Sequence, residues 1–320
     1  MVAFLVRRTI GAVLVCIVVT FIVFVIFIVV PGGGAQGTAE RIAGKNATPP
    51  LIAAVKHEWG FDRPFYDQYA IMMKKMFTGS LVSYTQQQNV LRQIEDGLPA
   101  TFSLTIGAGI IWLFFGILVG VISAVRAGRL SDRLITILAL IGISMPVFWL
   151  GIVTRFYLAE GGLTTFFPDG EYVPLTQSPL QWFWHLLLPW LVLAVLFVGF
   201  YGRVLRGNIL DTINEDFVRT AKAKGLSSRR ILVKHVLRAS LIPIVTLFGL
   251  DFAAVLGGGA ILTETVFDLH GVGQYARQSI SNLDLPPIMA VTMYGAMFIV
   301  VFSVFVDLFY AYLDPRIRPA

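Results

Sequence analysis

The chain has 320 residues, of which 56% are hydrophobic and 14% are charged, and its formal net charge is +6. An average soluble domain is about 45–50% apolar and about 25% charged. This composition therefore excludes an ordinary soluble enzyme and a disordered chain. The single cysteine, Cys16, excludes an intrachain disulfide and a cysteine-based metal cluster. Little material for a zinc site remains in the four scattered histidines, His57, His185, His235 and His270.

Six stretches are long and apolar enough to cross a bilayer, whose hydrocarbon core of about 30 Å requires roughly 20 apolar residues. In chain order they cover residues 9–30, 101–125, 134–154, 182–202, 239–263 and 285–306. Backbone polar groups must be paired inside lipid, so each stretch is expected to be a helix. None shows the short alternating pattern of a membrane β-barrel. The predicted fold class is an all-α membrane protein with six transmembrane helices.

Local features refine this prediction. The first stretch follows Arg7 and Arg8 and is also open to interpretation as a signal peptide, but signal-peptide cores span only about 7–15 residues. We therefore expect a retained anchor. Pro146 and Pro189 are expected to kink the third and fourth helices. His185 lies among tryptophans that are typical of an aromatic belt at the membrane surface.

The distribution of Lys and Arg predicts the orientation. Most of the 25 basic residues fall in segments 1–8, 126–133, 203–238 and 307–320, which lie on one side of the membrane if the chain crosses six times. Short cytoplasmic loops are enriched in Lys and Arg. The sequence thus predicts a multi-pass plasma (inner) membrane protein with both termini in the cytoplasm. The positive charge is explained by topology, and we expect no nucleic-acid partner.

The segments on the opposite side differ in character. The long loop at 31–97 contains a mixed stretch, Pro50–Phe77, that predicts one or two amphipathic helices broken near Gly60 and Pro64. We expect a small external cap, which is either a lid over the helix ends or a docking surface for a partner. The loop at 159–181 is predicted to be irregular. In the loop at 264–284, a Gly-Val-Gly sequence is too short to indicate nucleotide binding.

The cytoplasmic segment 203–238 is predicted to contain a short helix, followed by a second helix that Ser227 or Ser228 caps and that leads into the fifth span. Asn214 is a favourable N-cap, and two acids follow it in the first turn, where they complement the helix dipole. Gly225 suits a left-handed stop at the other end. A small apolar face is expected to unite Phe217, Val218 and Ala221. Three interpretations of this helix stay open: it lies on anionic lipid, it joins two spans as a solvated hairpin, or it fits a groove of another protein.

Longer motifs point to a family. The stretch at 219–246, RTAKAKGLSSRRILVKHVLRASLIPIVT, resembles the cytoplasmic EAA loop of ABC importer permeases of the dipeptide/oligopeptide/nickel branch. The other resemblances occur in order along the chain: FLVRRTIGAVLV (4–15), FDRPFYDQY (61–69), LPATFSLT (98–105), ISMPVFWLG (143–151), ETVFDLHGVG (264–273) and DLFYAYLDPRIR (307–318). The sequence departs from the family pattern at Arg219, His235, Arg238 and PGGG (31–34).

The resemblance implies a type I ABC importer transmembrane fold with an extracytoplasmic insertion between helices 1 and 2. It divides the chain into the cytoplasmic end with the first helix (1–30), the external loop domain (31–97), the transmembrane domain (98–311) and a cytoplasmic tail (312–320). The implied function is that of a permease subunit forming half of a pathway for di- or oligopeptides. A nickel chelate, a glutathione-like solute and a glycosidic solute are the alternative cargoes.

The same resemblance implies the partners. They are a second homologous permease, two ATPase subunits, an extracytoplasmic substrate-binding protein and membrane lipid. ATP and magnesium would belong to the ATPase subunits, with no cofactor or metal in this chain and no catalysis by it. In agreement, the sequence nearest to a phosphate-binding loop, at residues 43–46, lacks both the first glycine and the Ser/Thr.

By position, the resemblance assigns ATPase coupling to the 214–225 helix. An ATP-driven change in the membrane requires a contact that is bound differently in two states, and a firmly held helix can provide it. The residues expected at this contact are Phe217, Arg219, Thr220, Ala221, Lys222, Ala223, Gly225 and Leu226.

The candidates for the translocation path lie in the fifth span. A charge at the bilayer centre costs on the order of 2.5–3.5 kcal/mol, which makes Asp251 a functional candidate, although it can equally serve to join two helices. Gly257, Gly258 and Gly259 permit close packing or local unwinding. An intramembrane protease would need a nucleophile facing a base, and a channel or secondary transporter would need more charged or broken helices at the midplane. Both are disfavoured alternatives.

Overall fold

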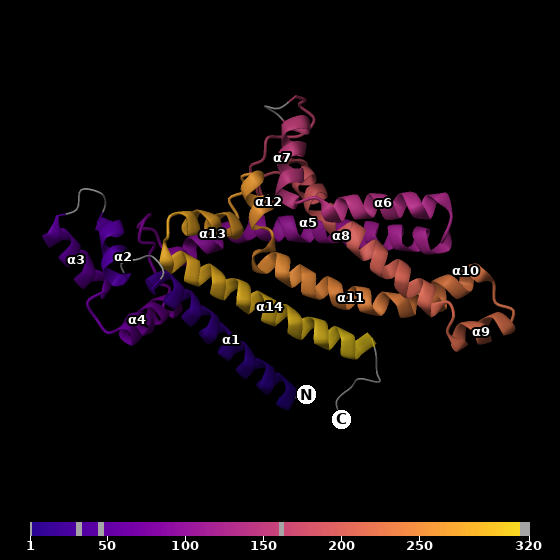
Figure 1. Ribbon diagram of the computed structural model, residues 1–320, viewed down its shortest axis with the longest axis horizontal. Coiled ribbons are helices and arrows are strands. Elements are labelled where there is room, and N and C mark those ends of the chain that lie inside the picture. The colour runs from indigo at the N-terminus through magenta and orange to yellow at the C-terminus, as the bar shows by residue number, and fades with distance from the viewer. Residues whose placement is uncertain (1, 30–33, 44–47, 160–162, 314–320) are drawn as a thin grey trace.

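The computed structural model describes residues 2–29, 34–43, 48–159 and 163–313, and the regular structure in these ranges is helical (Figure 1). The elements are α1 (Val2–Val29), α2 (Gly34–Ala43), α3 (Pro49–Trp59), α4 (Phe65–Phe77), α5 (Val90–Val125), α6 (Leu130–Ser144), α7 (Val147–Leu158), α8 (Pro179–Thr212), α9 (Asp216–Ala223), α10 (Ser228–Ile231), the wide turn η1 (Leu232–Val236), α11 (Leu237–Ala254), the wide turn η2 (Val255–Gly259), α12 (Ile261–Val266), α13 (Val272–Ser281) and α14 (Leu285–Leu313).

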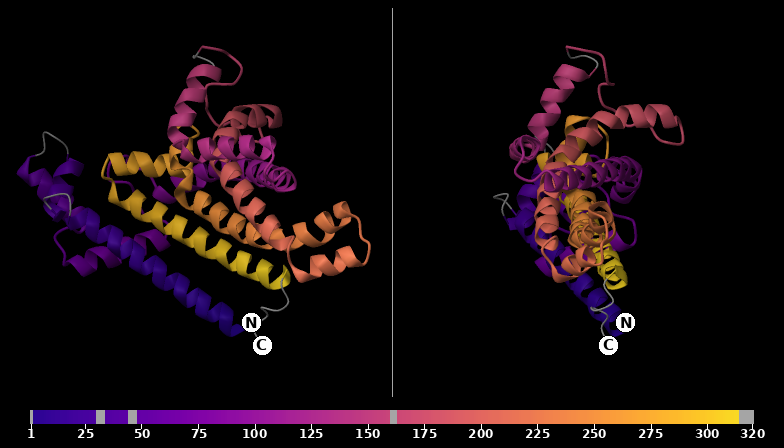
Figure 2. Two further views of the ribbon diagram at one scale, coloured as in Figure 1. Left: turned by 45° about the vertical axis from the view of Figure 1, so that its right-hand side comes forward. Right: turned by 90° about the vertical axis from the view of Figure 1, so that its right-hand side faces the viewer.

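The long helices run along the molecule and the short ones gather at its two ends. In Figure 1, α2, α3 and α4 form a cap at one end, and α9 with α10 projects at the other. Both views in Figure 2 place α1 beside α14, and these two helices pack against each other. The start of α1 and the end of α14 lie toward the end that carries α9. The predicted all-α membrane fold is confirmed.

Within the described residues, five helical runs are apolar and long enough to cross a membrane, and a sixth crossing results if α6 and α7 are counted together. The third span is therefore not the single kinked helix that we predicted. The axes of α6 and α7 differ by 99°, and Met145 between them is extended, with φ −81° and ψ 125°. Pro146 causes this break because a residue before proline is sterically excluded from the helical region.

The predicted end of the fourth helix is wrong by ten residues, because α8 continues past Gly202 to Thr212. The helical run that leads into the fifth span begins at Ser228 with Ser227 as its N-cap, as predicted. The apolar stretch marks the part of a helix that lies in lipid, whereas polar residues prolong the same helix into water. Consequently the non-helical part of the 203–238 segment is limited to the residues around α9.

The core of the bundle is the packing of α5 on α8. A Cβ at Gly107 of α5 would lie 2.0 Å from Cε2 of Trp190, so only glycine allows this approach. The Trp190 indole then donates a hydrogen bond to the Ser103 carbonyl at 2.9 Å. Pro189 stays inside α8. His185, predicted to belong to an aromatic belt, contacts the Gly170 carbonyl through Nδ1 at 2.6 Å.

The cap contains the two predicted helices and one that was not predicted. Helices α3 and α4 are separated near Gly60 and Pro64 as expected, with Gly60 in the left-handed region at φ 71°. Helix α2 had no prediction, and PGGG lies outside the described residues except for Gly34. Asp284, at the start of α14, joins the cap to the bundle: Oδ1 accepts from Tyr84 N at 2.9 Å, and Oδ2 accepts from the Ser83 and Thr85 hydroxyls at 2.5 and 2.6 Å.

Candidate functional site

Helix α9 is delimited by well-defined turns. Its N-cap is Glu215 rather than the predicted Asn214, because the Asn214 side chain instead donates to the Leu210 carbonyl of α8 at 3.0 Å. At the other end, Gly225 has φ 74°, and the Gly225 and Leu226 amides donate to the carbonyls of Lys222 and Ala221. These two bonds form a Schellman motif, so the predicted left-handed stop is confirmed.

The faces of α9 are unequal. Val218 and Ala221 are buried in the main apolar core together with Leu205 and Ile209 of α8. The predicted apolar face is wrong in one member, since Phe217 is 45% exposed. Phe217 lies about 100° from Val218 around the helix axis, which places its ring at the edge of the buried side. The exposed members of the predicted coupling set are Phe217, Arg219, Thr220, Lys222, Ala223 and Gly225, while Leu226 is half-buried.

The exposed surface of α9 is polar and basic around one aromatic ring. Arg219 reaches the Asp216 carboxylate at 3.3 Å, but both side chains are largely exposed. A surface ion pair of this kind contributes about 0–1 kcal/mol, so Arg219 is readily available to another acid. Because the ring of Phe217 is exposed among these charges, the surface has the composition of a contact site.

The helices next to α9 are hydrogen-bonded to one another. The Ser240 hydroxyl oxygen of α11 lies 3.2 Å from both the Asn208 carbonyl and the Thr212 hydroxyl of α8, and the Asn208 side chain donates to the Ser240 carbonyl at 3.4 Å. At the same end of the molecule, Arg206 of α8 forms a two-pronged contact with Asp132 of α6, with both N–O distances at 2.8 Å. Helices α6, α8 and α11 are thereby joined to one another at the end of the molecule that carries α9.

Asp251 lies in the interior, where the sequence placed a candidate for the path. It is half-buried, and its Oδ2 accepts a hydrogen bond from the Tyr201 hydroxyl at 2.7 Å. This bond joins α11 to α8. The Asp251 carboxylate is thus hydrogen-bonded to a neighbouring helix. The expected role of Asp251 in the translocation path stays a prediction.

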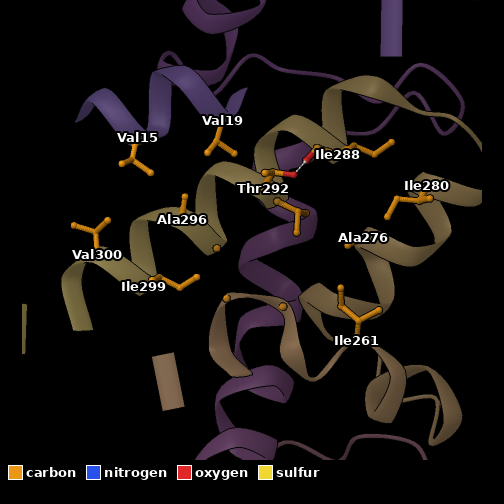
Figure 3. Close-up of a pocket in the computed structure, with 14 residues that line it drawn as sticks. Val15, Val19, Ile261, Ala276, Ile280, Ile288, Thr292, Ala296, Ile299 and Val300 are labelled. Atoms are coloured by element: carbon orange, nitrogen blue, oxygen red, sulfur yellow. Dashed lines mark hydrogen bonds between the residues drawn. The ribbon is translucent and has the colours of Figure 1, made fainter. Parts of the chain in front are cut away.

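The three glycines form the wide turn η2, where the fifth span is locally unwound. Gly258 has φ 134° and ψ −4°, a conformation that side chains disfavour. A Cβ at Gly295 of α14 would lie 2.3 Å from the Gly257 carbonyl oxygen. Close packing and unwinding therefore occur together. Gly257 and Gly258 line an apolar cavity of about 430 Å³ between α1, α13 and α14 (Figure 3).

A buried acid near this turn was missed by sequence reasoning. Glu264 is fully buried; Oε1 accepts from the Thr101 hydroxyl at 2.7 Å and Oε2 from the Gln274 amide at 2.9 Å. Burial raises the pKa of the Glu264 carboxyl above its ordinary value, and the hydrogen bonds to the carboxylate reduce this rise without cancelling it. The carboxylate caps the start of α13, in a segment predicted to be a loop. A Cβ at Gly271 would lie 2.4 Å from Oε2, which explains Gly-Val-Gly.

The predicted residues therefore occupy separate places. The coupling set lies at one end of the molecule, whereas Asp251 lies in α11 and the three glycines lie in η2, along the bundle. Within the described ranges, no three His, Cys, Asp or Glu side chains are close enough to hold a metal ion.

Known proteins are similar to this chain along nearly its whole length. Residues 116–319 match the family model of the binding-protein-dependent transport system inner membrane component, and residues 1–105 match the model of its N-terminal part. A dipeptide transport system permease protein of Alkalihalophilus pseudofirmus is 33% identical, with 99% of this chain and 100% of that protein covered. A di/tripeptide transport system permease protein of Pseudomonas aeruginosa is 31% identical, with 94% of each chain covered.

The fold resembles a solved membrane transporter. A chain of the inward-facing MetNI methionine ABC transporter superimposes with a TM-score of 0.53 at 16% identity, covering 70% of this chain and 97% of that chain. Similarity at this level of identity concerns the fold, and it agrees with a type I importer arrangement.

Proposed function

The chain belongs to the binding-protein-dependent transport system inner membrane component family, and from this premise we propose that α9 couples an ATP-driven motor to the membrane helices. As a member, the chain is a permease subunit of an ABC importer of the peptide type, embedded in the membrane by several apolar helices. Its cargo is di- or oligopeptides, in keeping with the relatives that transport dipeptides and tripeptides.

The observation that carries the coupling role is the construction of α9. One face, Val218 and Ala221, is fixed in the core, while the exposed sides of the helix present Phe217 and basic side chains to a neighbour. The Schellman turn at Gly225 fixes where the helix ends. A helix held in this way transmits displacement, whereas a loosely attached helix would absorb it by moving alone.

The mechanism follows from this attachment. Closure of two ATPase subunits on ATP shifts the bound helix, and the joints at Ser240 and at Asp132–Arg206 carry the shift to α6, α8 and α11. A transporter can alternate between two states only if the contact with its motor differs in free energy between them. The basic residues of α9 would pair with acids of the ATPase, and Phe217 would enter an apolar pocket of that subunit.

The assembly proposed contains a second homologous permease, two ATPase subunits that bind ATP and magnesium, and an extracytoplasmic substrate-binding protein. This chain would contribute binding and movement but no catalysis. Both termini would be cytoplasmic, because the basic loops and the start of α1 lie toward the end that carries α9. Asp251 and Gly257–Gly259 would line or gate the path.

The test is cross-linking in the complete transporter. With Cys16 replaced by alanine and the partner subunits devoid of reactive cysteines, a cysteine at Phe217 should cross-link to an ATPase subunit through a short bifunctional reagent, and the yield should change between nucleotide-free and ATP-bound states. A cysteine at Val233, which is exposed on the following helical run, is the matched control. Absence of any cross-link from α9 to an ATPase would refute the coupling role.

A further inference from the structure

Helix α4 of the cap carries an apolar stripe that is exposed at both ends, while its member Met73 is half-buried and packs against the cap core. Tyr66, Ala70, Met73 and Phe77 follow i, i+4, i+7, i+11 spacing and so lie on one side of the helix. Tyr66 is 69% exposed and Phe77 is 74% exposed. Two large rings at the ends of one exposed stripe are unusual for a surface that faces only water.

The position of α4 relative to α1 gives its depth. The Phe65 ring lies 5.4 Å from that of Phe24, and the Tyr69 ring lies 5.4 Å from that of Phe21. The Tyr69 hydroxyl also donates to the Ile17 carbonyl at 3.2 Å. These partners belong to the apolar window of α1, Thr9–Ile26. The first turns of α4 therefore touch a helix at a level where it is surrounded by lipid.

This level can be expressed as a distance. Phe24 and Phe21 precede Val30, the last residue of the apolar stretch 9–30, by six and nine residues. At about 1.5 Å per residue they lie about 9–14 Å below that end, measured along α1. Helices that lie in a membrane interface bury their apolar faces about 5–10 Å into the boundary between headgroups and acyl chains. The first turns of α4 therefore contact α1 at or below this depth.

The lipid-facing surface of α1 continues onto α4. Phe21 is exposed on α1, and next to it lie Phe65 and then Tyr66, both of them exposed. The opposite side of α4 packs into the cap: Met72 is buried, and Lys75 lies over the Trp59 ring at 5.2 Å. Asp67 and Lys74 occupy the remaining flank, seven residues apart, where they can reach the headgroups or water.

From this arrangement we infer that α4 is an interfacial helix whose Tyr66–Ala70–Met73–Phe77 stripe inserts into the lipid leaflet nearest the cap. In the proposed orientation this is the outer leaflet. Tyrosine and phenylalanine suit the interface because aromatic rings are favoured at this depth. One surface of the external cap is thus occupied by membrane and is closed to a docking receptor. The inference concerns the location of α4 and does not depend on the coupling role of α9.

The test measures the depth of the stripe in the assembled transporter. Cys16 is replaced by alanine, single cysteines are placed at Tyr66, Ala70 or Phe77, and a nitroxide spin label is attached to each. The complex of both permeases with cysteine-free ATPase subunits is reconstituted in phospholipid nanodiscs. Collision of the label with oxygen, which concentrates in lipid, is compared with collision with a water-soluble nickel chelate by power saturation. Val18 on the exposed face of α1 and Glu58 on α3 supply lipid and water controls.

Labels at the three stripe positions are expected to favour oxygen, as at Val18, whereas the label at Glu58 favours the nickel chelate. Preference for the chelate at the stripe would show that it faces water and would overturn the inference. Suppressed collision with both reagents would show that a protein surface covers the stripe, and this would also overturn it. Each labelled complex is first required to retain uptake, so that only folded protein is compared.

Discussion

The replacement Ala221→Asp tests how firmly α9 must be held for transport. Ala221 is 6% exposed and Val218 is fully buried, and these two side chains provide the apolar contact between α9 and the bundle. We expect the variant to enter the membrane normally, because none of the membrane spans contains the substitution, yet to lose the connection between ATP hydrolysis and uptake.

The expected change in the free energy that holds α9 on the bundle follows from the side chains that it buries. Full burial of Val218 stabilises the attachment by about 2 kcal/mol and the methyl group of Ala221 by about 0.8 kcal/mol. An unpaired carboxylate at this position costs several kcal/mol, taken here as about 5 kcal/mol. The net preference then becomes about 2 kcal/mol against attachment. At equilibrium this leaves α9 docked in about one molecule in thirty, since every 1.4 kcal/mol is a factor of about ten.

The assay is ATP-driven uptake of a labelled dipeptide into proteoliposomes that contain the complete transporter, measured beside the ATPase rate. Uptake by the Ala221→Asp complex should fall roughly in proportion to the docked fraction, to a few per cent of the original. Ser228→Asp is the matched control: it adds the same charge at an exposed position in the first turn of α10, where an acid is favourable.

Normal uptake by the Ala221→Asp complex would refute this reasoning, because it would mean that α9 need not be attached through its buried face. An equal loss in the Ser228→Asp control would refute it as well, since added negative charge would then explain the effect without detachment.

Three further predictions concern the turn after α9 and the joints between helices. Gly225→Ala should lower uptake moderately, because a side chain in the left-handed region costs about 1 kcal/mol while its Cβ meets no atom within 4 Å; an unchanged uptake rate would contradict this. Arg206→Ala should lower the free energy of unfolding by about 3 kcal/mol, since Asp132 is left buried without its cation. Thermal unfolding of the purified complex measures this loss of stability, and Arg203→Ala is the control. Tyr201→Phe should remove about 1.5 kcal/mol from the same quantity by deleting the bond to Asp251, and an unchanged midpoint would contradict it.

Much of the fold was predictable because lipid imposes a simple rule on composition. Each candidate membrane span among the described residues overlaps one of the predicted apolar stretches, and Gly60 with Pro64 located the break in the cap. The rule does not indicate where a helix ends in water, so the extension of α8 to Thr212 was missed. It also does not fix bend angles, and Pro146 was therefore taken for a kink when it separates two helices.

The candidate site was predictable to the extent that its signals are local. Gly225 was identified because a left-handed stop has a clear residue preference, and the structure confirms its conformation. Phe217 was misplaced since a short helix offers too few residues to define its buried direction. Glu264 was missed because its partners, Thr101 and Gln274, are brought to it by folding. The roles of the coupling residues and of Asp251 stay predictions.

The bonds from Asp284 to Ser83, Tyr84 and Thr85 have a consequence for biogenesis. They connect residues about 200 positions apart, and the cap core also includes Tyr275, Leu285 and Met289 from the last part of the chain. A ribosome synthesises the cap long before these partners emerge, and domains generally fold from the N-terminus as they are made. The cap must therefore wait, incompletely packed, until α14 is inserted, so a nascent chain arrested before Asp284 should expose a cap that proteases cut and the finished protein protects.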